Sequence, residues 1–108
     1  MIFEALSSAA ERGELILVEG GLCHWHLRKD GQLTIREILV LPECRRRGIG
    51  TAMLAQLKEK GATSIFAKCP LSLTQPLRWY RRQGFVEEGR EMTRSGKTLV
   101  LLRLSLGD

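Results

Sequence analysis

Cysteine is scarce in this chain of 108 residues, and its three cysteines are scattered. An odd, dispersed set does not form the paired framework of a small secreted protein, so we expect a reducing compartment, the cytoplasm. The first residues lack a basic segment followed by a long apolar one, so we predict no signal peptide. No apolar run approaches the length of a membrane span, and we expect no membrane contact.

Aromatic residues are also few, at 6%, and the lysines are dispersed. Both features argue against a nucleic-acid binder, which needs a continuous basic face with stacking aromatics. Repeats, low-complexity tracts and linkers are absent as well. With 44% hydrophobic and 27% charged residues, the composition is that of an ordinary globular protein, and we predict a single domain over residues 1–108.

Positive charge is in excess, because 17 lysines and arginines face 12 acids and give a net charge of +5. Such a balance suits an anionic ligand, an acidic protein surface or nucleic acid. Six of the 17 occupy two clusters, namely Arg45 to Arg47 and the set Arg78, Arg81 and Arg82. The first cluster adjoins a glycine turn, which favours a ligand over a merely solvated face.

The most informative segment spans residues 35–54, where an apolar run, a proline, three arginines, Gly48-Ile49-Gly50 and an amphipathic pattern follow one another. This order predicts a strand, a tight turn and a helix whose free N–H groups form an anion site, most naturally for phosphate. A P-loop does not fit the glycine spacing. The dinucleotide fingerprint fails too, because Met53 stands where its third glycine belongs.

Periodicity and turn residues predict a helix over residues 2–12 and strands over 14–19, 22–29 and 32–41, with a hairpin at Asp30-Gly31. A helix over 48–60, a strand over 64–69, a helix over 74–83 and strands over 85–92 and 98–104 follow. The crossover between residues 32 and 69 is long enough to make two strands parallel. We therefore predict a mixed α/β (α+β) fold with a twisted, mostly antiparallel sheet and flanking helices.

The pattern Arg-x-x-Gly-x-Gly of residues 45–50 resembles the pyrophosphate-binding motif of the GCN5-related N-acetyltransferase (GNAT) superfamily. Residues 80–85, Tyr-Arg-Arg-Gln-Gly-Phe, resemble the family's Tyr-x-x-x-Gly-Phe signature. Both motifs fall in the expected elements and in the expected order, and the resemblance covers about residues 14–105. It implies an acyl-CoA acyltransferase fold and an acetyl-CoA-dependent N-acetyltransferase acting directly on a primary amine of a small molecule, protein or peptide.

The resemblance also implies where acetyl-CoA binds. Its pyrophosphate would lie on the N–H groups of the turn and the first helical turn, where aligned donors and the positive helix end stabilise anions. Gly48 and Gly50 would let the backbone approach without a Cβ. The pantetheine arm would pair with the end of the central strand. The implied cofactor-binding residues are Ile38, Leu39, Val40, Arg45, Arg46, Arg47, Gly48, Ile49, Gly50 and Thr51.

Glu37 is the candidate general base. Simple strand alternation places it on one face with Leu33, Ile35, Leu39 and Leu41. A carboxylate on an apolar face is partly desolvated, which shifts its pKa toward a useful range. In the resembled family this strand position often carries a base that deprotonates the amine, frequently through water. The alternative is a glutamate at the core edge that is paired with an arginine.

Tyr80 matches the family tyrosine that protonates the departing CoA thiolate. It also falls on the inward stripe of its helix with Leu73 and Leu77, where an aromatic side chain usually belongs to the core. Both roles are compatible, because tyrosine has an apolar body and a polar tip. His24 and His26 share one strand face, but two histidines are too few for a metal site, and we expect none.

Two departures from the family pattern open alternatives. Many members carry an asparagine seven residues before the tyrosine, whereas this chain has Leu73 there, so Thr74 or Gln75 would have to replace that contact. The chain is also short for the family and would lack a further strand and helix at its N-terminal side. That reduction implies an open site, a very small acceptor, a pocket completed in a homodimer, or a non-catalytic acyl-CoA-binding module.

Overall fold

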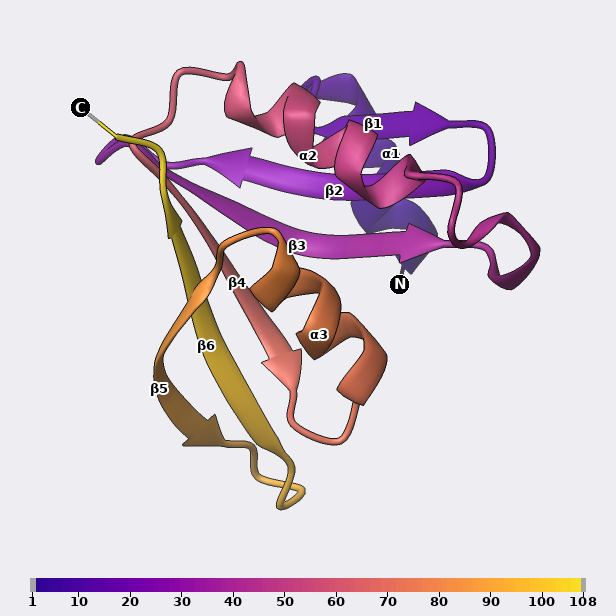
Figure 1. Cartoon of the computed structure of the whole chain (residues 1–108). Coiled ribbons are helices and arrows are strands. Elements are labelled where there is room, and N and C mark those ends of the chain that lie inside the picture. The colour runs from indigo at the N-terminus through magenta and orange to yellow at the C-terminus, as the bar shows by residue number, and fades with distance from the viewer. Residues whose placement is uncertain (1, 108) are drawn as a thin grey trace.

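Six strands form one sheet in the order β1-β2-β3-β4-β6-β5 (Figure 1). The computed structural model describes residues 2–107. Its elements are α1 (Ile2–Glu11), β1 (Leu15–Val18), β2 (Gly21–Leu27), β3 (Gln32–Val40), the 3₁₀ turn η1 (Pro42–Cys44), α2 (Ile49–Lys58), β4 (Ser64–Pro70), α3 (Thr74–Arg82), β5 (Val86–Met92) and β6 (Thr98–Ser105).

The predicted order of helices and strands is confirmed, and the ends of the elements differ from prediction by only a few residues. Strands β3 and β4 run parallel, joined through α2, and all other neighbouring strands are antiparallel. The predicted hairpin turn holds Gly31 at a φ of 92°, a conformation that glycine adopts at little cost. The predicted mixed α/β fold with a mostly antiparallel sheet is therefore confirmed.

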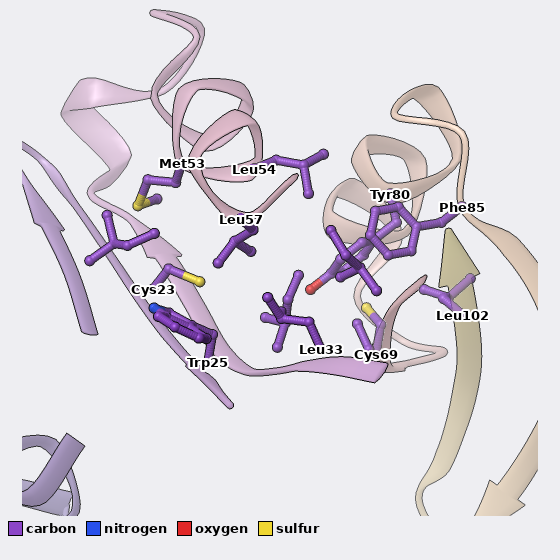
Figure 2. Close-up of a cluster of buried hydrophobic side chains, with 14 of the residues drawn as sticks. Cys23, Trp25, Leu33, Met53, Leu54, Leu57, Cys69, Tyr80, Phe85 and Leu102 are labelled. Carbon is purple, nitrogen blue, oxygen red and sulfur yellow. The ribbon is translucent and has the colours of Figure 1, made fainter. Parts of the chain in front are cut away.

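Helices α2 and α3 cover one face of the sheet, and α1 lies on the other (Figure 1). We call these the front face and the back face. The main core lies under α2 and α3, where Met53, Leu54 and Leu57 meet Leu33 and Tyr80 (Figure 2). On the back face, α1 buries Ala9 completely. None of the helices within residues 2–107 is long and apolar enough to span a membrane.

A bulge in β3 overturns the predicted pattern of strand faces. Trp25 pairs with Ile35 while His24 pairs with Glu37, so Arg36 is an extra residue in β3. Such a residue shifts the alternation that follows it and bends the strand. Beyond the bulge, Ile38 and Val40 pack against the front core instead.

The residues expected to share a face with Leu33 and Ile35 therefore lie elsewhere. Leu39 and Leu41 are 52% and 53% exposed. Glu37 lies opposite His24, which alternates in β2 with the core residues Cys23 and Trp25. The prediction of one regular strand face is wrong for Leu33 and Ile35, because simple alternation does not continue through the bulge. Leu39 remains on the same face as Glu37.

Candidate cofactor groove and active site

The two parallel strands separate soon after they begin. β3 and β4 pair over Gln32 to Ile35 and Ser64 to Ala67, and beyond these residues they diverge (Figure 1). A groove of about 730 Å³ lies at this divergence, lined by the far half of β3, the end of β4, the turn before α2, and α3. The unpaired edge of β3 in the groove leaves backbone N–H and C=O groups available to an extended ligand.

Most of the predicted site residues meet in this groove. All of the predicted cofactor-binding residues except Arg47 line it, and so do Glu37 and Tyr80. These residues come from β3, α2, α3 and the turn between β3 and α2, so the fold brings together residues far apart in the sequence. Sequence reasoning missed Lys68, Trp79 and Gln83, which also line the groove.

The turn before α2 has an unusual backbone. Arg46 and Gly48 have φ angles of 67° and 75°, in the left-handed region that glycine adopts readily and arginine does not. No side chain caps the N-terminus of α2, and Ala52 donates the first helical hydrogen bond, at 2.9 Å to the Gly48 carbonyl. The N–H groups before Ala52 therefore point out of the helix end and are suited to bind an anion.

The first turn of α2 packs against α3. A Cβ at Gly50 would lie 3.2 Å from Cζ2 of Trp79, which is too close without movement of the indole. One residue on, Gln83 Nε2 donates a hydrogen bond of 3.1 Å to Thr51 Oγ1. Glycine at position 50 is therefore required by packing, in addition to the close approach to a phosphate that the sequence predicts. The contact with Trp79 holds α2 and α3, two walls of the groove, together.

Tyr80 is 5% exposed and belongs to the core, as its position in the helix predicts. Its ring meets Trp79 and Phe85 edge-on, with centroids 5.1 Å apart in both pairs. Its hydroxyl points away from α3 towards Leu33 and Cys69 (Figure 2). Burial raises the pKa of the phenol, and the neighbouring Cys69 and Cys23 thiols raise it further. The hydroxyl is therefore protonated at neutral pH and can act as a proton donor.

Charge in the groove is strongly asymmetric. Among the described residues that line it, Glu37 is the single acid, and it has no hydrogen-bond or ion-pair partner within residues 2–107. The alternative prediction of an arginine-paired Glu37 is therefore wrong in this structure. Six cationic side chains share the lining: Arg36, Arg45, Arg46, Lys68, Arg78 and Arg82. This excess of positive charge favours a strongly anionic ligand.

The two histidines lie outside the groove lining. His26 Nδ1 is 2.5 Å from Glu14 Oε2, and Arg12 binds the same carboxylate at 2.6 Å. The Arg12 guanidinium, followed by His26, holds the pKa of Glu14 below its usual value. Within residues 2–107, no three His, Cys, Asp or Glu side chains gather as a metal site would require.

Similar folds occur in solved structures. A GNAT-family acetyltransferase from Bacillus cereus has 16% identity and a TM-score of 0.81, over 94% of this chain and 77% of that one. The ribosomal-protein-S18-alanine N-acetyltransferase from Escherichia coli has 18% identity and a TM-score of 0.73, with the same coverage. A protein from Bacillus anthracis, solved in complex with acetyl coenzyme A, has 20% identity and a TM-score of 0.71 over 80% of this chain.

This chain spans 56% of the length of the Bacillus anthracis protein, so it corresponds to part of that relative. A search of curated protein sequences gives no significant match. The sequence model of the acetyltransferase (GNAT) domain, in contrast, matches residues 5–87, which include the bulged strand, the turn and Tyr80. The chain therefore belongs to the GNAT acetyltransferase domain family.

Proposed function

We propose that this protein transfers an acetyl group from acetyl-CoA directly to a primary amine. The observation that carries the proposal is one groove whose lining includes the uncapped N-terminus of α2, several arginines, Tyr80 and Glu37. An anionic donor and a proton-transfer site would thus share one cavity. Family membership supports the reaction type.

The groove fits CoA by its chemistry. The N–H groups from Arg46 to Thr51 would hold the pyrophosphate, with Arg45, Arg46 and Arg47 around it. The unpaired edge of β3 at Ile38 to Val40 would pair with the amides of the pantetheine arm. In this proposal the acyl end of the donor would lie near Tyr80 and Glu37. When bound, acetyl-CoA supplies an activated thioester.

Two side chains would manage the protons. Glu37, directly or through a water molecule, takes a proton from the amine, whose nitrogen forms a bond to the thioester carbonyl carbon. The carbon–sulfur bond breaks, and the buried Tyr80 hydroxyl donates a proton to the departing sulfur. Proximity of both groups to one bound donor supplies much of the rate acceleration.

The direct test of this function combines binding and turnover. Calorimetry should detect CoA binding, and a thiol-release assay should detect free CoA that depends on the amine added. Absence of CoA binding would contradict the proposal. Binding without release across a broad amine panel would instead favour a non-catalytic acyl-CoA-binding module.

A pair of glycine variants separates anion binding from backbone strain. Gly48 and Gly61 have φ angles of 75° and 86°, and a Cβ at either position meets nothing within 4 Å. Alanine at each should cost similar stability, about 1–2 kcal/mol, because both adopt the left-handed conformation. CoA affinity, measured by calorimetry, should fall at least tenfold for Gly48→Ala and remain unchanged for Gly61→Ala. Equal affinities would argue against the turn as the phosphate site.

Tyr80→Phe should lower kcat by about 10²-fold or more, as loss of a general acid does. The CoA dissociation constant and the melting temperature should change little, since the ring is retained. Because the raised pKa keeps the phenol protonated, ionisation of Tyr80 should cause no loss of wild-type activity between pH 8 and 10. A Tyr80→Phe variant with wild-type turnover would remove this residue from the mechanism.

Glu37→Gln should reduce kcat/KM at pH 7 by about 10²-fold, because the amine then loses its general base. The deficit should shrink toward pH 10, where more of the amine is already deprotonated. A matched control is Glu59→Gln, an exposed carboxylate just after the far end of α2. The pH–rate profiles of both variants test this role, and a constant deficit at every pH would assign Glu37 a structural role instead.

A further inference from the structure

The groove reaches both faces of the sheet, which bears on where the acceptor enters. Ile38 and Val40 pack against the front core. The neighbouring Glu37 and Leu39 alternate with them along β3, yet all four line the groove. The proposed function places the donor's pyrophosphate at the N-terminus of α2, on the front side, so the amine is left to approach from the back side. The inference below rests on that proposed function.

Three leucines form a row across the back face beside Glu37. Leu17 pairs with Leu22, and Leu22 pairs with Leu39, so the three side chains share one face of β1, β2 and β3. We call them the leucine row. Leu17 is 67% and Leu39 is 52% exposed, so the leucine row presents exposed apolar surface. The next row along the strands, Leu15, His24 and Glu37, places the free carboxylate two residues from Leu39.

The opposite rim of the groove is apolar as well. Leu73, at the start of α3, lines the groove and is 48% exposed. Leucine therefore occupies both rims, on β3 and before α3. The leucine row is continuous with the groove because Leu39 is a member of both.

The charges next to this apolar surface set a second limit on the acceptor. Lys68, on β4 across the gap from the bulge, is bound to Glu91 at 2.7 Å, and Arg36 is exposed at the bulge itself. Glu14, which precedes β1, is already bound by Arg12 and His26. Among the described residues that line the groove, Glu37 is the single carboxylate that can receive an ammonium group. A second positive charge on the acceptor, held in the groove, would therefore meet cations and leucines instead of a partner.

We infer that the acceptor is an apolar monoamine whose hydrocarbon part lies on the leucine row while its nitrogen meets Glu37. A hydrophobic small amine and a peptide α-amine with an apolar first residue share this chemistry. Diamines and polyamines are poorer acceptors, because a second ammonium group would lie near leucine and the cations of the groove lining, which repel it.

A matched pair of amines tests the inference on the intact protein. Hexylamine and 1,6-diaminohexane have the same carbon chain and differ by the second amino group. The kcat/KM for hexylamine should exceed that for the diamine by at least tenfold. The tripeptide amide of Leu-Ala-Ala is assayed alongside. A kcat/KM above that for hexylamine would indicate a peptide acceptor, and a lower value would indicate a small-molecule acceptor.

The variant Leu39→Asp places a second carboxylate beside Glu37. It should lower the ratio of kcat/KM for hexylamine to kcat/KM for the diamine at least tenfold. The control is Val86→Asp on β5, an edge position that is 68% exposed and outside the groove lining. It should leave the ratio unchanged. A ratio is insensitive to partial unfolding, since misfolded protein lowers both rates equally.

Each contrary outcome has a separate meaning. A wild-type preference for the diamine, or a ratio that Leu39→Asp does not move, would overturn the inference while leaving the proposed function intact. A wild-type dimer that Leu39→Asp dissociates without changing the ratio would assign the leucine row to a second copy of the chain. Failure of every amine, despite CoA binding, would overturn the proposed function and the inference with it.

Discussion

The separation of β3 from β4 is the constraint on which the rest of the site depends. Two parallel strands that stayed paired to their ends would close the sheet and leave no groove between α2 and α3. Their pairing ends at Ile35, and the extra residue of the bulge, Arg36, follows immediately. Because a bulge bends its strand and interrupts the ladder, the position of this residue determines where the groove opens and which side chains line it.

Beyond the bulge, neighbouring residues of β3 lie on opposite faces of the sheet. Ile38 and Val40 pack against the front core, and Glu37 and Leu39 lie on the back face. A regular strand would have set Glu37 on the same face as Leu33 and Ile35, inside the core. The bulge therefore supplies a carboxylate at the groove without burying it among apolar side chains, where an unpaired charge is expensive.

The opposite wall depends on contacts between the two front helices. Trp79 packs over Gly50, and Gln83 binds Thr51, so the N-terminus of α2 and the last turn of α3 are held together. Tyr80, adjacent to Trp79, is set in the core by edge-on contacts with two aromatic rings. The same packing that raises the pKa of its phenol also holds the ring in one place, which is what a proton donor at a fixed site requires.

The local elements and several of the residues that line the groove could be predicted from the sequence, because they depend on short-range signals. Glycine stops, Asp30-Gly31 and the apolar spacing of α2 and α3 depend on neighbours within a few residues, and the two motifs identify the turn and Tyr80. The face of the sheet on which Glu37 lies could not be predicted, because the alternation of side chains in a strand does not reveal where an extra residue is inserted. The packing of Trp79 on Gly50 joins residues 29 positions apart and needs the tertiary fold.

The most direct test of the account is a crystal structure of the protein with CoA. We expect the pyrophosphate on the N–H groups between Arg46 and Thr51, the pantetheine arm along the unpaired edge of β3 at Ile38 to Val40, and the sulfur near the Tyr80 hydroxyl. A ligand bound elsewhere, or a sulfur atom remote from both Tyr80 and Glu37, would contradict the claim that the divergence of β3 and β4 forms the acetyl-transfer site.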